Sequence, residues 1–276
     1  MTVSLMRRTA LTCATALSTA LFAMLMVGCS TPPVDESANA TAERLYKDAR
    51  EDIESGSFER AIKTLERVEG LASGSLLGQQ ALLEIAYLNW KTGERAAGLT
   101  AIERFIKLNP SSPALDYALY LRGVLNFSDN LGLLGSWFGQ DLSERDQKAS
   151  RESYQAFKQL VDQFPNSRYT PDARLRMNFI INSLASYEVH VARYYLRRGA
   201  YVAAANRAQQ AVAEYQQTPA VEEALFILVQ SYEKLELPKL RDDAERVLRQ
   251  NFPTSAYLDG SANLGPREKT WWRFWE

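Results

Sequence analysis

The stretch AYLNWKTGERAAG, residues 86–98, decides the fold because it places a glycine between two small residues at a defined spacing. The glycine lies seven residues after an alanine and five residues before a second glycine. The same spacing recurs in AREDIESGSFERA at 49–61 and in ARYYLRRGAYVAA at 192–204. Small residues let two helices cross closely, and the central glycine permits the left-handed backbone that ends the first helix. Each stretch therefore predicts a hairpin of two helices.

Helices are expected along the whole body of the chain. From Thr41 onward, apolar residues recur at spacings of three and four, without the alternation that is typical of strands. Proline closes several second helices, in NPS at 109–111, FPN at 164–166 and FPT at 252–254. We therefore predict an all-α protein whose helix-turn-helix units resemble the tetratricopeptide repeat, with its period of about 34 residues. Such hairpins stack into a superhelix whose concave surface can hold an extended peptide or another domain.

Five repeats are predicted, and they differ in regularity. They span 42–74, 79–111, 113–167, 171–217 and 220–254. The third contains an inserted loop from Ser128 to Lys148, the fourth has a lengthened first helix, and the fifth is irregular around Leu237 and Pro238. The apolar, glycine-rich part of the loop at 131–138 either packs against its own repeat or binds another molecule, because it would be costly to leave in water.

Residues 1–28 have the pattern of a signal peptide. Arg7 and Arg8 precede a run without any charge from Ala10 to Val27. An uncleaved anchor is the alternative, since about 18 apolar residues are just long enough to span a bilayer. The threonines and serines in the run, and the small residues before Cys29, argue instead for cleavage and for lipidation of that cysteine. The segment VGC at 27–29 resembles a bacterial lipoprotein processing box.

Lipidation of Cys29 leads to further expectations. Several acyl chains, palmitate among them, would hold the protein permanently at a membrane, because each buried methylene contributes about 0.8 kcal/mol. By resemblance to lipoprotein sorting rules, Ser30 indicates the outer membrane. Cys13 leaves with the signal, so disulfides and cysteine–metal sites are excluded, and we expect no cofactor besides the covalent lipid.

The mature chain divides into three predicted parts. Residues 29–40 form a lipidated, flexible tether, because they lack apolar periodicity and contain Pro, Ser and Asn. Residues 41–255 form the repeat domain, and residues 256–276 form an aromatic tail. The tail contains WWRFW at 271–275, which either caps the apolar face of the last repeat or lies at a membrane interface or in a partner groove.

Composition argues against an enzyme and against a nucleic-acid-binding protein. Without Arg7 and Arg8, 30 of the 32 basic residues remain against 33 acidic ones, so the mature net charge is −3. His190 is the only histidine, so a metal cluster or a Cys–His dyad is excluded, and we expect His190 to be structural. Counting does not exclude a Ser–His–carboxylate arrangement, but no nucleophile elbow, phosphate loop or dinucleotide fingerprint occurs. The repeats also leave no room for a separate catalytic domain such as transglycosylases need.

Several segments resemble the D-subunit family of the outer-membrane β-barrel assembly machine, over about 42–255. The segments that carry this resemblance are IERFIKLNP at 102–110, DYALYLRG at 116–123, WFG at 137–139, RD at 145–146, FPNSRY at 164–169, VARYY at 191–195, RGA at 198–200 and NR at 206–207. One departure is EGLASG at 69–74, where the family has Tyr-Pro-Phe-Gly. This departure bears on the details of the precursor groove.

The resemblance implies a lipoprotein on the periplasmic face of the outer membrane, without chemistry of its own. Such a protein recognises unfolded β-barrel precursors, docks on the barrel subunit of the machine beside its accessory lipoproteins, and promotes folding and insertion. The alternative is a pilotin-type repeat lipoprotein that escorts secretin subunits, which would have the same membrane location and the same fold. The inserted third repeat and the NR pair at 206–207 favour the assembly machine.

The partner-binding residues implied by the resemblance lie in the fourth repeat. They are Tyr195, Arg198, Asn206 and Arg207. Arg207 matches the family's arginine at the surface that docks on the barrel subunit, and an exposed arginine can form forked ion pairs with acidic partners. The alternative interpretation of Arg207 is a solvated surface residue.

The substrate-groove residues lie on the first helices of the second and third repeats. They are Tyr87, Tyr117, Tyr120 and Arg122. Tyrosines suit extended precursor peptides with an aromatic end. For each tyrosine the alternative is packing between repeats, because an aromatic residue at helical spacing is usually part of a core.

Overall fold

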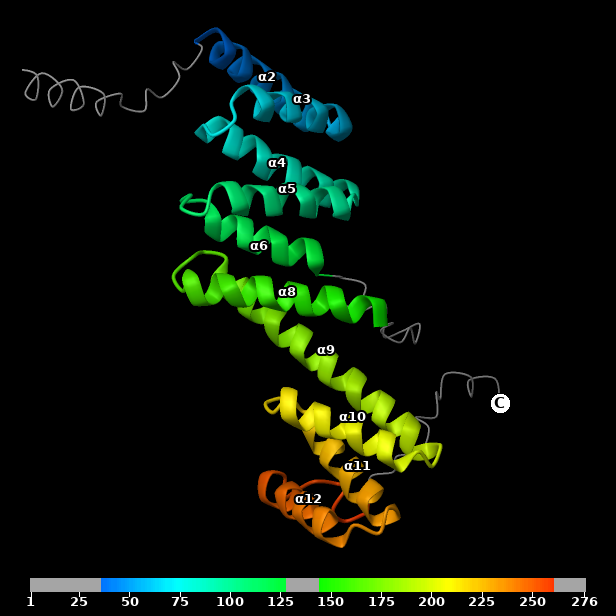
Figure 1. Cartoon of the computed structure of the whole chain (residues 1–276). Helices are drawn as coiled ribbons and strands as arrows, with labels where there is room; N and C mark the ends of the chain where they lie inside the picture. Colours follow the sequence, from blue (N-terminus) through cyan, green and yellow to red (C-terminus); the bar gives the residue numbers. More distant parts are fainter. Residues whose placement is uncertain (1–35, 128–143, 261–276) are drawn as a thin grey trace, which may run out of the picture. The chain divides into compact units, whose positions relative to one another are not determined.

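The computed structural model describes residues 36–127 and 144–260, and all regular structure in these ranges is helical (Figure 1). The prediction of an all-α protein is therefore confirmed for the described residues. The helices are α2 (Glu36–Glu54), α3 (Phe58–Leu71), α4 (Leu76–Thr92), α5 (Arg95–Leu108), α6 (Leu115–Asn126), α8 (Glu144–Gln163), α9 (Thr170–Arg197), α10 (Tyr201–Glu214), α11 (Ala220–Lys234) and α12 (Pro238–Asn251).

These helices follow one another as hairpins at the predicted repeat positions. The pairs are α2 with α3, α4 with α5, α6 with α8, α9 with α10, and α11 with α12. Helix α9 has 28 residues, so the lengthened first helix of the fourth repeat is confirmed. Its N-terminal part shares a buried cluster with α6 and α8, and its C-terminal part shares another with α10, α11 and α12, so α9 connects two hairpins.

Three turns have the geometry that the recurrent spacing predicts. Gly56, Gly93 and Gly199 have φ angles of 78°, 84° and 76°, in the left-handed region. The small residues on either side of these glycines are buried: Ala49, Ala61, Ala86, Gly98, Ala192 and Ala204. A Cβ atom on Gly98 would lie 2.7 Å from the Leu125 side chain and 3.2 Å from the Ala86 carbonyl oxygen. A larger side chain there would therefore push α5 away from α4 and from α6.

The last hairpin turns with a different residue. Glu236 lies where the α2–α3, α4–α5 and α9–α10 hairpins have glycine, and its φ angle is 59°. Leu237 is the N-cap of α12 and Pro238 is the first residue of that helix. The irregularity predicted around these residues is therefore a turn that places a glutamate in a backbone conformation favouring glycine.

The chain forms two compact units, which divide between Gly78 and Gln79. In the first unit, α2 and α3 bury Leu45, Leu65 and Val68 with several alanines. The second unit contains most of α4 and all later helices. Its core includes one cluster around Phe157 and Ile180 and another around Ile227 and Leu248.

Two boundaries differ from the prediction. Helix α2 begins at Glu36, so part of the range assigned to the flexible tether is helical. A first helical turn needs no apolar periodicity, and an acidic residue there interacts favourably with the helix dipole. Helix α8 begins at Glu144, so the end of the predicted 128–148 loop is helical as well. Amphipathic spacing alone does not mark these ends, because the terminal turn of a helix can lie in solvent.

The C-terminal boundary also shifts. Tyr257, predicted to belong to the tail, stacks on Phe226 of α11 with ring centroids 4.8 Å apart. The packed body therefore extends past 255. Cys29, the apolar loop segment 131–138 and the aromatic segment 271–275 lie outside the described residues. Within the described part of the chain, every helix is too short or too polar to cross a bilayer.

Candidate partner-binding site

The fourth repeat contains a carboxylate inside the core stripe of α9. Leu184, Ala185, Val189 and Ala192 form the buried side of this part of the helix, and Glu188 lies among them. Only 1% of the Glu188 surface is exposed. A buried carboxylate requires compensating partners because its transfer out of water is costly. Our sequence analysis missed Glu188, although a charged residue at a position of the apolar stripe is a signal that could have found it.

Two arginines from neighbouring helices compensate Glu188. Arg207 of α10 donates a hydrogen bond from Nη1 to Oε2 of Glu188, at 3.1 Å. Arg151 of α8 places Nη2 3.9 Å from the other carboxylate oxygen. The arginine side chains remain 37% and 48% exposed, respectively. One buried negative charge therefore joins three helices and holds two guanidinium groups that reach the surface.

Tyr215 completes this cluster. It is the C-cap residue of α10, and its buried side chain hydrogen-bonds to Arg151. This hydrogen bond raises the pKa of Arg151 above its usual range, while burial raises the pKa of Tyr215. The phenol therefore stays neutral near physiological pH. The end of α10 is thus tied to the beginning of α8 as well as to α9.

The other partner-binding residues predicted in this repeat occupy different positions on the hairpin. Tyr195 is partly buried against the core of α9 to α12. Arg198 is exposed at the C-cap of α9, with its guanidinium 5.4 Å from the ring centre of Tyr194. Asn206 is exposed on α10. Of this set, Arg198, Asn206 and Arg207 present polar groups at the surface, whereas Tyr195 contributes mainly to packing.

Arg207 differs from the alternative interpretation as a solvated surface residue, and docking by Arg207 stays a prediction. Its guanidinium is neither buried nor simply solvated, because Glu188 holds it by one nitrogen. Arg193 on the same hairpin gives a useful contrast. It donates from Nε and Nη2 to the two oxygens of Glu223, which fastens α9 to α11. The forked edge of Arg193 is therefore occupied within the protein, whereas the bond from Arg207 to Glu188 uses a single nitrogen, Nη1.

Two of the three tyrosines of the predicted substrate groove pack together near the start of α9. Tyr117 and Tyr120 of α6 lie against Tyr169, with ring centroids 5.3 Å and 4.9 Å away. The Tyr120 hydroxyl donates a hydrogen bond to Asp172 at 2.8 Å. Burial, with smaller contributions from Tyr169, Tyr87 and Glu84, raises the pKa of Tyr117 to about 12. These contacts match the alternative of packing between repeats, and they leave precursor binding by the two tyrosines as a prediction.

Tyr87 is the most exposed aromatic residue of that set, and it has a neighbour that our sequence analysis missed. Tyr87 and Trp90 lie one turn apart on α4, with ring centroids 5.7 Å apart. They are 38% and 41% exposed. The spacing of three residues on a helix was the available signal. The structure therefore places two adjacent aromatic rings at the surface of the second repeat.

Arg122 does not join the tyrosines, which corrects the predicted grouping. It lies five residues after Tyr117, which is about 140° around an α-helix. Its Nη2 donates to Gln159 of α8 at 2.6 Å, and its Nη1 lies 3.6 Å from Glu103 of α5. Arg122 thus lines a separate groove of about 760 Å³ between α5, α6 and α8. Proximity in sequence was misleading here because a helix turns its neighbours to different sides.

His190 lies on α9, as expected, and its side chain is exposed. Within the described ranges, no group of three His, Cys, Asp or Glu side chains is close enough together to hold a metal ion. The polar groups that the structure brings together in the fourth repeat are instead arginine–carboxylate pairs. These pairs suit recognition of a charged surface.

Comparison with known proteins gives the family. Residues 38–248 match the YfiO family, described as "Outer membrane lipoprotein". The chain belongs to the YfiO family. The match covers every described helix from the first hairpin to most of α12. The resemblance stated from the sequence segments is confirmed.

Relatives of this YfiO-family chain have been named in several bacteria. The "Outer membrane protein assembly factor BamD" of Neisseria meningitidis serogroup A is 43% identical over 264 residues, covering 94% of this chain and 98% of that protein. The protein of that name in Haemophilus influenzae is 33% identical, covering 83% and 87%. In Xylella fastidiosa strain Temecula1 the identity is 35%, covering 79% and 74%. These matches favour the assembly-factor prediction over the pilotin alternative.

Solved structures are similar at a lower level. A chain described as "kinesin light chain nearly identical TPR-like repeats" has a TM-score of 0.34 and 13% identity. The alignment covers 79% of this YfiO-family chain and 98% of that chain. The tetratricopeptide-type assignment rests on the helical hairpins and their turns, described above.

Proposed function

We propose that this protein takes part in assembling outer-membrane proteins, as a component of the β-barrel assembly machine. The observation that carries this proposal is the 43% identity with a BamD protein across 94% of this chain and 98% of that relative. The similarity covers nearly the whole of both chains. It therefore includes the hairpins that would contact partners. The protein acts by binding unfolded precursors and other subunits, and catalyses no reaction.

Attachment to the membrane occurs through lipid on Cys29, with the repeats on the periplasmic side. The charge-free run after Arg8, the small residues before Cys29 and the description of the family as lipoproteins support this part of the proposal. Replacing Cys29 by alanine is expected to abolish incorporation of labelled palmitate, because the acyl chains are carried by this residue. Metabolic labelling followed by immunoprecipitation measures this, and a Cys29→Ala protein that still incorporates palmitate would contradict lipid anchoring at Cys29.

Docking on the barrel subunit involves the α9–α10 hairpin, with Arg207 as the main polar contact. Support comes from the partly exposed guanidinium of Arg207 and from the exposed Arg198 and Asn206 on the same hairpin. Arginine suits this role because its planar fork matches a carboxylate. An acidic surface on the barrel subunit is therefore the expected binding partner for this hairpin.

Unfolded precursors bind to the aromatic surface of the second and third repeats. Tyr87 and Trp90 are the exposed rings that support this role. They offer apolar area at a low cost in side-chain entropy, which suits an extended peptide with an aromatic end. Photo-crosslinking from Trp90 to such a peptide is expected. The same label at the exposed Arg249 of α12 is the control and is expected to remain uncrosslinked.

Co-purification tests the docking proposal. Arg207→Gln is expected to reduce recovery of the barrel subunit while the helical content, measured by circular dichroism, stays the same. Glutamine is preferable to charge reversal, which would place a second carboxylate beside buried Glu188. The matched control is Arg249→Gln, which also removes an arginine ion-paired to a glutamate, but on α12. Equal recovery with Arg207→Gln and with the control would remove Arg207 from the docking site.

A further inference from the structure

The hydrogen bond between Arg207 and Glu188 occupies one end of the guanidinium group. The donor is Nη1, and the bond length is 3.1 Å. Within the described part of the chain, no contact is assigned to the Nε and Nη2 hydrogens of Arg207. The same edge of Arg193 makes a forked contact with both oxygens of Glu223. The Nε–Nη2 edge is the one that binds a carboxylate with two parallel hydrogen bonds. In Arg207 this edge remains available on a side chain that is 37% exposed.

The position of Glu188 is an unfavourable one for a carboxylate. It lies on the buried stripe of α9, among Leu184, Ala185 and Val189. An apolar side chain would pack in such a stripe without the desolvation cost of a charge, so a buried ion pair is weak support for stability. What an apolar residue cannot supply at this position is a fixed anchor for the guanidinium of Arg207.

Arg151 shares the charge of Glu188 from the opposite side. It is farther from the carboxylate than Arg207 is, at 3.9 Å, and its hydrogen bond with Tyr215 holds it in place. Glu214 is a further negative charge near Arg151, so the two carboxylates balance the two guanidinium groups. A partner carboxylate would therefore be recognised through hydrogen bonds to the Nε–Nη2 edge of Arg207 and not through an excess of positive charge.

We propose that Glu188 is a positioning residue for partner docking, which holds Arg207 so that its Nε–Nη2 edge meets a carboxylate of the partner. The partner group is an aspartate or glutamate side chain on the docking face. An arginine that is already ordered loses less side-chain freedom on binding than one that moves freely in solvent. This inference rests on the proposed docking role of Arg207.

A double-mutant cycle tests the positioning role. The full mature chain is titrated with the purified periplasmic part of the barrel subunit, and the dissociation constant and both rate constants are measured. Glu188→Gln is expected to raise the dissociation constant about three- to tenfold, which is the range for ordering one long side chain. The dissociation rate constant should account for this change, and the association rate constant should stay the same. In an Arg207→Gln background, the same substitution is expected to change nothing further, because Glu188 acts through Arg207. Losses that add, or a Glu188→Gln protein that binds normally, would overturn the positioning role.

Arg151→Gln separates positioning from stability. It disturbs the same cluster but leaves the contact between Arg207 and Glu188 in place, so it is expected to lower the melting temperature without weakening docking. Weakening equal to that of Glu188→Gln would mean that the cluster acts only by holding the fold. If Glu188→Gln folds poorly, Glu188→Asp keeps the charge and withdraws it by one methylene. That variant must also weaken docking, and normal binding by it would refute the proposal.

The outcome for Arg207 alone distinguishes the two proposals. Unchanged affinity in Arg207→Gln would refute the docking site itself, whatever Glu188 does. Reduced affinity in Arg207→Gln together with normal affinity in Glu188→Gln would keep the docking site and refute only the positioning role. The two failures therefore produce different patterns in the same set of measurements.

Discussion

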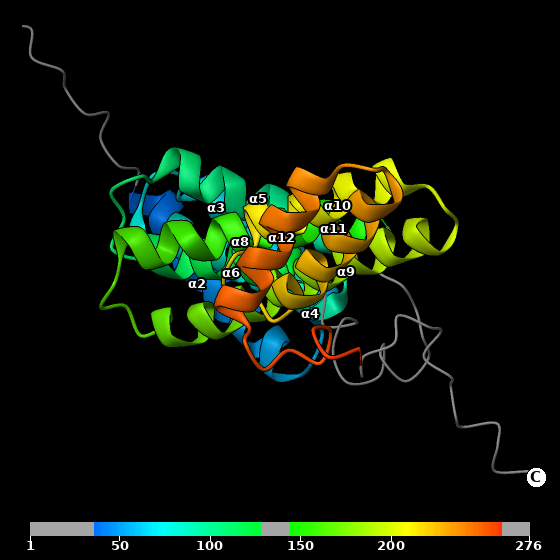
Figure 2. The same cartoon turned by 90° about the horizontal axis from the view of Figure 1, so that it is seen from below.

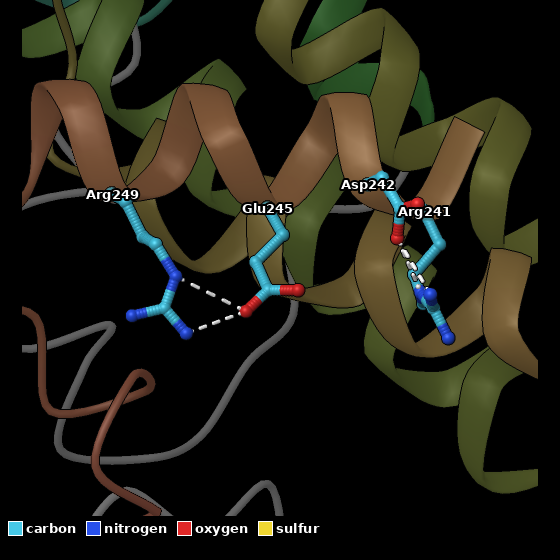
Figure 3. Close-up of polar contacts among 4 residues, drawn as sticks. All are labelled: Arg241, Asp242, Glu245 and Arg249. Carbon is cyan, nitrogen blue, oxygen red and sulfur yellow. Dashed lines mark hydrogen bonds and ion pairs between the residues drawn. The ribbon is translucent and has the colours of Figure 1, made fainter. Parts of the chain in front are cut away.

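The α9–α10 and α11–α12 hairpins are built on similar turns but use charged residues differently. Gly199 turns the first with a φ angle of 76°, and Glu236 turns the second with 59°. In the first hairpin Glu188 is buried between arginines of two other helices. In the second, the carboxylates of α12 lie at the surface and pair with arginines of the same helix, Arg241 with Asp242 and Arg249 with Glu245 (Figure 3).

The two hairpins show that the features that form a hairpin differ from the features that give it a binding surface. The left-handed turn and the close packing of the two helices occur with either turn residue; α11 and α12 lie side by side in both views (Figures 1 and 2). Ion pairs within one exposed helix are screened by water and contribute little to stability. A pair that links helices through a buried carboxylate can instead orient a side chain for binding. The two hairpins should therefore respond differently to the same kinds of substitution.

The largest effect is expected from removing the buried carboxylate. Glu188→Ala should lower the free energy of unfolding by about 1.5–3 kcal/mol, the range for hydrogen bonds to charged groups. The two arginines can turn toward solvent, so the loss stays below that of a fully enclosed ion pair. Urea unfolding followed by circular dichroism measures the change. A loss under about 0.5 kcal/mol, the scale of a surface substitution, would show that burial adds nothing to this pair.

A smaller loss of stability is expected when the α9–α10 hairpin is given the turn residue of the α11–α12 hairpin. Gly199→Glu should cost roughly 1.5 kcal/mol, because a residue with a Cβ atom is disfavoured at positive φ. Steric crowding adds little, since a Cβ at this position would meet only the Tyr201 hydroxyl, at 3.9 Å. The midpoint of urea unfolding gives the change, and an unaltered midpoint would mean that the turn tolerates any residue.

The reverse exchange should stabilise the second hairpin. Glu236→Gly relieves the left-handed strain but gives the unfolded chain more freedom, so the net gain is expected to be about 0.5–1 kcal/mol. Glu236→Ala is the matched control, because it removes the charge and keeps the Cβ atom. Equal stability of the alanine and glycine variants would attribute the effect to the charge and not to the backbone.

The smallest effect is expected on the surface of α12. Glu245→Ala removes the partner of Arg249 and should change the free energy of unfolding by less than about 0.5 kcal/mol. Thermal unfolding at low and high salt provides the measurement, since any contribution of the pair must shrink with ionic strength. A loss as large as that of Glu188→Ala would remove the distinction between the two hairpins.

Much of the fold could be predicted from the sequence alone, because hairpin formation depends on nearby residues. The spacing around Gly56, Gly93 and Gly199 predicted three turns, and proline segments predicted where second helices end. The predicted starts of α2 and α8 were wrong, since a terminal helical turn needs no apolar pattern. For the candidate site, the sequence indicated the helices that carry Arg207 and Tyr87, but not their contacts.

The amino-acid sequence by itself determined the helices, their pairing and the family, because these depend on local spacing and on extended similarity. Only the tertiary structure decided which side chains meet. Tyr120 and Asp172 lie 52 residues apart, and Arg122 and Gln159 lie 37 apart. Glu188 is held by α8 and α10 together. Such contacts depend on how each helix is rotated against its neighbours, and this rotation is set by packing across hairpins.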